Sequence, residues 1–267
     1  MHGGGWYEGN KRRVLGTGML DCLPEQGYAL VSVEYRLSPE ARFPAQIDDV
    51  RMALDHIDAN GDGLGLDRTR VVVAGFSAGA HLAALAAART APGYLRPLGA
   101  IIIGAPTDFL RNPRATDPAQ NPHLAEGIMC AEHQLLGGPV LEHAEEAERA
   151  NPLRYVDAAT PPYLILHGCL DQTVPVSQAK FLHEALVAVG AESTLVTVTD
   201  GNHGLSDARH RGAAFLPGVE RLMLAFLDRT LRGATIDLPG GRHAITVDGL
   251  RLGGKGATSG ASDRVIT

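Results

Sequence analysis

The sequence predicts an α/β protein whose mainly parallel sheet is covered by helices on both faces. Short apolar stretches alternate with helical stretches along most of the chain, which is typical of a parallel sheet with helical crossovers. Some of the strand-like stretches are apolar throughout, for example residues 98–104, as strands buried on both faces are. The length of 267 residues and the 45% hydrophobic content fit one large domain with a sizeable core.

The first half of the chain is expected to hold three helices and three strands. Apolar residues at helical spacing, such as Ile47, Val50 and Leu54, indicate a helix that begins at Pro44. The elements expected in this half are a helix over residues 11–24, a strand over Tyr28–Tyr35, a helix over residues 44–57, a strand from Val71, a helix over residues 82–88 and a strand over residues 98–104.

The second half begins with a stretch of different composition. Residues 106–150 contain five prolines and an acidic run, and we expect an insertion over the active site there, part helix and part loop. The elements expected after it are a strand over residues 161–168, a helix that stops at Gly190, a strand over residues 193–199 and a helix over residues 217–232 that stops at Gly233.

This pattern divides the chain into two parts. Residues 1–233 are expected to form the catalytic domain, and residues 234–267 a C-terminal tail. In the tail, Ala244–Val247 and Leu250–Leu252 flank Asp248-Gly249, which predicts a short peripheral hairpin around a type I′ turn. The Gly- and Ser-rich residues after it are expected to be disordered.

The chain is organised around the stretch Val71–Leu82. It runs from β-branched residues through Gly-Phe-Ser-Ala-Gly into an alanine-rich segment, a strand, a sharp turn and a helix. Gly75 and Gly79 would keep the two arms of the turn apart, so that the Ser77 hydroxyl stands clear of the sheet beside the helix N-terminus. A nucleophile next to unpaired amide donors is what acyl transfer requires.

Composition and charge exclude several other classes of function. The net charge of −6 is dispersed and forms no basic stripe, so we expect no nucleic-acid partner. No apolar run reaches the roughly 18 residues of a membrane span. Cys22, Cys130 and Cys169 match no zinc or redox spacing, so we expect no metal, no cofactor and a cytoplasmic location. A signal peptide upstream of a truncated N-terminus stays open.

Five motifs occur in a fixed order along the chain, and together they resemble the α/β-hydrolase superfamily. Bacterial esterases similar to hormone-sensitive lipase, and hydrolases of the BD-FAE (feruloyl and acetyl esterase-like) type, are the nearest resemblance, and it covers residues 1 to about 232. The motifs are His2–Trp6, Tyr35–Glu40, Gly75–Leu82, Pro161–Gly168 with Asp171, and Gly201–Gly204.

The resemblance implies a catalytic triad in the chain order Ser, Asp, His. Ser77 would be the nucleophile, Asp171 the acid and His203 the base. The backbone N–H groups of Gly4, Gly5 and Ala78 would form the oxyanion hole.

Other acidic and basic residues compete for two of these roles. Asp108 is the more serious rival for the acid. Of the other histidines, His81 and His167 are interpreted as structural neighbours that make local contacts.

The resulting functional hypothesis is a serine carboxylic-ester hydrolase for small to medium acyl esters. An amidase or formamidase of the same fold, and a non-catalytic binding protein on a hydrolase scaffold, stay open as alternatives. The expected partner is a small-molecule ester, and a homodimer remains open.

The resemblance also implies an apolar strand directly before His2, preceded by further strands. Only Met1 precedes His2, so the N-terminal strands are expected to be missing. The missing strand would lie between the Tyr28–Tyr35 and Val71 strands. We expect that something fills this slot or that the sheet closes up, because unpaired buried backbone groups cost on the order of 1–3 kcal/mol each.

Overall fold

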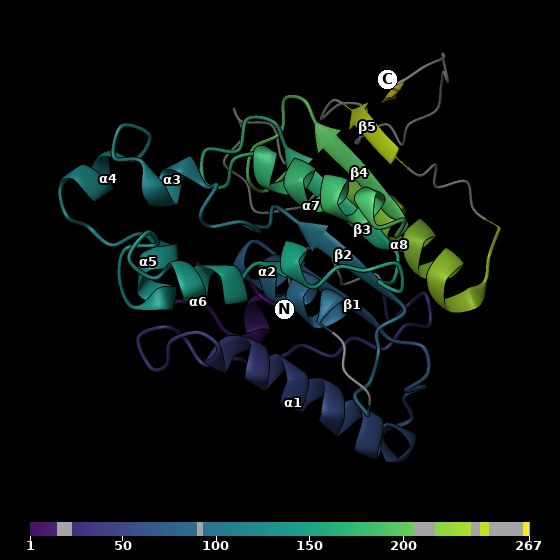
Figure 1. The fold of residues 1–267 in the computed structure, drawn as a ribbon. Coiled ribbons are helices and arrows are strands. Elements are labelled where there is room, and N and C mark those ends of the chain that lie inside the picture. Colours follow the sequence, from purple (N-terminus) through teal and green to yellow (C-terminus); the bar gives the residue numbers. More distant parts are fainter. Residues whose placement is uncertain (15–22, 90–92, 206–216, 236–240, 246–263, 267) are drawn as a thin grey trace.

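The computed structural model describes residues 1–14, 23–89, 93–205, 217–235, 241–245 and 264–266 (Figure 1). Within these residues, six strands form one sheet in the order β1-β2-β3-β4-β5-β6, and every neighbouring pair is parallel. The strands are β1 (Val72–Phe76), β2 (Gly99–Ile103), β3 (Tyr163–Gly168), β4 (Ser193–Val198), β5 (Gly241–Ile245) and β6 (Arg264–Ile266).

Helices connect the strands and cover both faces of the sheet. Four long helices pack on it: α1 (Ala45–Asn60), α2 (Ala78–Ala88), α7 (Ser177–Ala188) and α8 (Pro217–Arg232). Between β2 and β3 lie α3 (Pro113–Thr116), α4 (Pro122–Ala125), α5 (Ala131–Leu136), α6 (Ala144–Arg149) and the 3-10 helix η3 (Pro152–Arg154). Figure 1 shows α3 to α6 grouped on one side of the molecule. Two further 3-10 helices are η1 (Lys11–Val14) and η2 (Asp62–Leu64).

The core has two layers, one on each face of the sheet. Alternate strand residues such as Ile102 and Ile165 pack with α1, α2 and α7. Their sequence neighbours Ile101 and Leu164 pack with α8 instead. This division confirms the predicted fold class, because successive side chains of a strand point to opposite faces.

Most of the predicted elements are present at close to their predicted bounds. The helix over residues 217–232 has the predicted limits, and Gly233 after it adopts a positive φ of 66°, as a residue that ends a helix often does. The segment 106–150 is part helix and part loop, as predicted.

The predicted strand over Tyr28–Tyr35 does not form. This segment has no strand pairing, and side chains hold it instead: the Tyr28 hydroxyl donates to Asp228 Oδ1 (2.6 Å), and the Tyr35 hydroxyl donates to the His2 carbonyl (2.8 Å). The prediction was wrong because apolar alternation indicates a strand only where another strand lies in reach to pair with it. Of the helix predicted over residues 11–24, the described residues form η1 and the start of a turn at residues 23–27. Residues 15–22 lie outside the described part, so the prediction is not tested there.

A groove separates the Tyr28–Tyr35 segment from the sheet. Among the described strands, β1 pairs with β2 alone, and the other edge of β1 faces a groove of about 390 Å³ lined by residues 28–33 and 71–74. At one end of the groove the Met1 amino group donates to the Ala74 carbonyl (2.7 Å). No described strand fills the slot expected between the two segments, and the sheet does not close up over it.

The hairpin predicted in the tail stays a prediction, because its turn and its second arm lie outside the described residues. Ala244 and Ile245 belong to β5, which pairs in parallel with β4 on one side and with β6 on the other. An antiparallel partner at residues 250–252 would need one of these two edges, and residues 246–263 lie outside the described part. The outer edge of β4 offers a full ladder of backbone donors and acceptors, which an isolated hairpin does not have.

None of the described helices is both long enough and apolar enough to cross a membrane.

Candidate active site

Ser77 lies at the sharp turn between β1 and α2. Its backbone has φ 54° and ψ −122°, a combination that a residue with a side chain rarely adopts and that costs on the order of 1–3 kcal/mol. The turn is held from both sides, because the Ser77 N–H donates to the Ile103 carbonyl on β2 (2.8 Å) and all of α2 is buried. The predicted strand, turn and helix are therefore present.

Glycines allow this turn to form. A Cβ on Gly75 would collide with the backbone carbonyl of Gly79, and a Cβ on Gly79 would collide with the carbonyl of His2. A Cβ on Gly3 would lie 3.3 Å from the Ser77 Cβ. The turn and the N-terminal loop thus approach each other more closely than any residue with a side chain would permit.

His203 and Asp171 form a hydrogen-bonded pair on the loops after β4 and β3. The distance from His203 Nδ1 to Asp171 Oδ2 is 2.6 Å, and the Asp171 side chain is fully buried while that of His203 is 22% exposed. The His203 ring packs on Phe76, the residue before Ser77, with 4.8 Å between ring centroids. His203 and Ser77 line the same pocket.

The Asp171 carboxylate accepts hydrogen bonds at both oxygens. Oδ1 accepts from the Thr173 and Val174 N–H groups (2.7 and 2.8 Å), and Oδ2 lies 3.2 Å from His167 Nε2 in addition to His203. Burial alone would raise the pKa of Asp171, but the hydrogen bonds from His167 and His203 outweigh it and hold that pKa well below its usual range. The carboxylate is therefore charged at neutral pH and fixed in orientation.

The N-terminal loop places backbone N–H groups at the same pocket. Gly4 and Gly5 have positive φ values of 123° and 55°, and they line the pocket together with Ala78 at the start of α2. Within the described part of the chain, the Gly4 and Gly5 N–H groups donate to no other group. These N–H groups are available to an oxygen of a bound ligand.

Contacts from the following segment anchor this loop at both ends. The Tyr35 ring stacks on the His2 imidazole (4.2 Å between centroids) and its hydroxyl binds the His2 carbonyl. Further along, the Ser38 N–H donates to the Trp6 carbonyl (2.8 Å). The Trp6 side chain is buried against His81 and Phe109.

The pocket itself has a volume of about 480 Å³ and two kinds of wall. One wall comes from the N-terminal loop and the turn, with Trp6, Tyr7 and Phe76. The other wall is polar and comes largely from α3 to α5 and the Asp171 loop. Its polar members are Arg114, Asn121, His123, Glu132, Gln172 and Thr173.

This polar wall was not predicted residue by residue, although the sequence holds a signal for it. An Asn-Pro pair begins α3, α4 and η3, at Asn112, Asn121 and Asn151. Each Asn side chain accepts a hydrogen bond from the N–H group two residues later, and proline suits the first helical position. The two Asn-Pro pairs in the 106–150 segment therefore indicate where α3 and α4 start, whereas α5 and α6 begin without such a pair.

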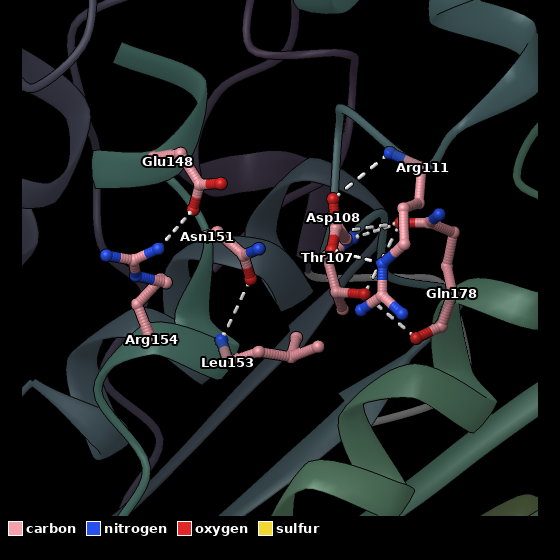
Figure 2. A network of polar contacts seen from close by, with 8 residues as sticks. All are labelled: Thr107, Asp108, Arg111, Glu148, Asn151, Leu153, Arg154 and Gln178. Carbon is pink, nitrogen blue, oxygen red and sulfur yellow. Dashed lines mark hydrogen bonds and ion pairs between the residues drawn. The ribbon is translucent and has the colours of Figure 1, made fainter. Parts of the chain in front are cut away.

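Asp108, the rival acid, is engaged elsewhere. Figure 2 shows its carboxylate bound by Arg111, whose Nε lies 2.6 Å from Oδ2. The Asp108 and Thr107 N–H groups both donate to Gln178 Oε1 on α7 (2.7 and 2.8 Å). The structure therefore pairs His203 with Asp171 and ties Asp108 into a contact between the loop after β2 and α7.

His81 is buried one helical turn after Ser77 and is not among the residues that line the pocket. Its Nε2 lies 2.7 Å from the Ala150 carbonyl next to η3. Burial lowers the pKa of His81 to about 4, although the bond to Ala150 acts in the opposite direction. Among the described residues, no group of three or more His, Cys, Asp or Glu side chains could hold a metal ion.

The parallel sheet, the turn at Ser77 and the pocket at the carboxyl ends of the strands define an α/β-hydrolase. Within that superfamily the chain belongs to the BD-FAE family, whose model matches residues 1–186.

Comparison with known proteins gives relatives of both kinds, by sequence and by structure. Esterase LipC of Mycobacterium tuberculosis is 32% identical over 241 residues, which is 84% of this chain and 58% of LipC. A bifunctional GH43-CE protein of Bacteroides eggerthii is 26% identical with a TM-score of 0.72, covering 86% of this chain and 31% of that one. A truncated carbohydrate esterase from gut microbiota has a TM-score of 0.74 at 23% identity and covers 86% of this chain and 84% of its own.

The chain spans only part of its mycobacterial relatives: 58% of LipC and less than half of two others.

Proposed function

We propose that this protein is a serine carboxylic-ester hydrolase that cleaves small to medium acyl esters through an acyl-enzyme. The hydrogen bond from His203 to the buried Asp171, with His203 in the same pocket as Ser77, carries this proposal. A nucleophile, a base and an orienting acid are the three parts that this chemistry needs. The family and the name of LipC agree with an esterase.

In the proposed reaction, Ser77 Oγ attacks the ester carbonyl carbon while His203 Nε2 takes the hydroxyl proton. The Gly4, Gly5 and Ala78 N–H groups stabilise the oxyanion that forms. His203 then gives its proton to the leaving alcohol, and the acyl group stays on Ser77. A water molecule, activated by His203 in the same way, releases the acid. Asp171 holds the Nδ1–H tautomer and stabilises the imidazolium throughout.

The polar wall of the pocket supports a polar alcohol as the leaving group. Arg114 and Gln172 lie on this wall within 3.4 Å of each other and still have N–H groups to offer a ligand. Hydroxyl groups on the alcohol would accept hydrogen bonds from these donors, which a purely apolar alcohol could not do.

The first test is Ser77→Ala, measured with a p-nitrophenyl ester series of increasing acyl length and with a fluorophosphonate label. The variant should stay folded, lose at least ~10³-fold in kcat/KM and take no label. Retention of most of the activity would show that the nucleophile is another residue. N-formyl anilides assayed beside the esters separate the esterase from the amidase alternative. A wild-type protein that turns over neither class would support the binding-protein alternative.

A further inference from the structure

His167 is a fully buried side chain at the end of β3 that the proposed reaction does not use. Its Nε2 faces two acceptors, the Val174 carbonyl at 2.9 Å and Asp171 Oδ2 at 3.2 Å. Its Nδ1 is buried and has no hydrogen-bond partner within the described part of the chain.

These contacts determine where the ring proton lies. A carbonyl and a carboxylate oxygen both only accept hydrogen bonds, so Nε2 must carry the proton and share it between them. A second proton on Nδ1 would be a buried donor with no acceptor, so Nδ1 holds a lone pair, which stays unpaired in the core. An apolar side chain of similar volume would avoid that loss, so packing alone does not explain a histidine here.

The His167 ring also contacts two residues of the loop that carries Asp171, residues 171–174. Val174 receives a hydrogen bond at its carbonyl from His167 and gives one from its N–H to Asp171 Oδ1. His167 thus contacts the loop at Asp171 and at Val174 and ties residues 171–174 to the end of β3.

We propose that His167 is a positioning residue, which as a neutral Nε2–H donor to Asp171 Oδ2 fixes the carboxylate and limits the charge that it presents to His203. This inference rests on the proposed function. Asp171 Oδ2 is shared between the two imidazoles. Removing the His167 donor leaves more negative charge for His203, so the protonated form of His203 is stabilised and the neutral base appears only at higher pH.

The test compares His167→Leu, which has no donor, with His167→Gln, whose amide N–H₂ can reach the two acceptors. In His167→Leu the acid limb of the kcat/KM profile should move to higher pH by about half a unit to one unit. Its plateau kcat should fall roughly 10-fold with KM unchanged, because a freer carboxylate orients His203 less well. In His167→Gln the limb should stay at the wild-type pH.

Both variants keep the other groups around His203 unchanged. His203 faces Asp171 from the loop after β3 and Phe76 from β1. The titratable and charged side chains that line its pocket are Tyr7, Glu8, Arg114, His123, Cys130 and Glu132. A difference between the two variants therefore reports the His167 donor and not these side chains.

A second measurement needs no variant at position 167. In ¹⁵N-histidine-labelled Ser77→Ala protein, which does not depend on turnover, His167 should carry its ring proton on Nε2 and none on Nδ1. A proton on Nδ1, or on both nitrogens, would overturn the proposal. So would an unshifted acid limb in His167→Leu, or a shift of equal size in His167→Gln. Failure of the esterase assignment is separate, because it would appear as activity retained by Ser77→Ala.

Discussion

The acid and the nucleophile stand on strands with very different support. β3, which leads to Asp171, has a paired strand on each side, and the Asp171 carboxylate is held by neighbours within seven residues of it and by His203. β1, which leads to Ser77, pairs with β2 alone among the described strands, and its other edge faces the groove.

The difference shows two ways of fixing a reactive side chain. On the acid side, the backbone ladder and local hydrogen bonds do so. On the nucleophile side, the turn relies on segments distant in the sequence: the N-terminal loop that packs against Gly79, and Tyr35, which holds that loop. We therefore expect changes on the acid side to act on proton transfer, and changes on the nucleophile side to act through the placement of the oxyanion donors.

The largest expected effect is on the acid side. Asp171→Asn should leave the fold intact but disfavour the tautomer that His203 needs, and it should lower kcat by up to ~10⁴-fold. Asp108→Asn is the matched control and should cost less than ~10-fold, because its carboxylate binds Arg111 instead. Steady-state kinetics of both variants shows whether Asp171 or Asp108 is the acid. The opposite ranking would move the acid to the segment between β2 and β3.

The next expected effect concerns the buried His81, one helical turn after Ser77, and the free energy of unfolding below neutral pH tests it. His81 titrates near pH 6.5 when unfolded, but burial lowers its pKa to about 4 in the folded protein. Above pH 6.5 both states are neutral and no stability is lost. As the pH falls from about 6.5 to about 4, His81 becomes protonated in the unfolded chain but stays neutral in the folded protein. The free energy of unfolding should therefore fall by ~3 kcal/mol.

Urea unfolding of the wild type and of His81→Gln, at several pH values in this window, measures that loss. Gln is of similar size and uncharged at every pH, so the variant should lack this part of the pH dependence. Equal slopes for the two proteins would contradict the role assigned to His81.

The smallest effect expected concerns the support of the N-terminal loop. Tyr35→Phe removes the hydrogen bond to the His2 carbonyl and should lower kcat about 3–10-fold with KM nearly unchanged, since one such bond contributes ~0.5–1.5 kcal/mol. Tyr163→Phe is the matched control, because it removes a similar buried bond to the Ala84 carbonyl (2.9 Å) on α2, away from the loop.

Both variants should lose similar stability in thermal melts, and only Tyr35→Phe should lose rate. If both lose rate alike, kcat follows overall stability and the loop needs no such support.

The parts that could be predicted from the sequence are those with local causes. The strand, turn and helix around Ser77 follow from adjacent residues, namely β-branched residues, two glycines and an alanine-rich run. Asp171 and His203 could be singled out because each follows a strand, and strands of a parallel sheet end at one edge.

The parts that failed depend on partners far away in the chain. Residues 28–35 look like a strand, but whether they pair depends on what lies beside β1. In the tail, residues 241–245 pair with the edge of β4, a partner that the local hairpin pattern does not reveal, and the hairpin itself stays a prediction. His167 is a neighbour of the Asp171 loop, as expected, but a sequence does not show which way its ring points, so its hydrogen bond to Asp171 could not be predicted.

The polar wall between β2 and β3 has a consequence for how such a protein diversifies. Its helices α3 and α4 each start at their own Asn-Pro pair and are four residues long, so a change within one leaves the start of the other intact. The turn at Ser77 has no such tolerance, because a methyl group added at Gly75 or Gly79 meets backbone atoms. Substitutions that change the preferred leaving group can therefore occur in α3 or α4 separately, without changes at the Ser77 turn. Libraries that randomise Arg114 and His123, which line the pocket, and leave the Asn-Pro pairs and the glycines unchanged should retain folded members with altered preference.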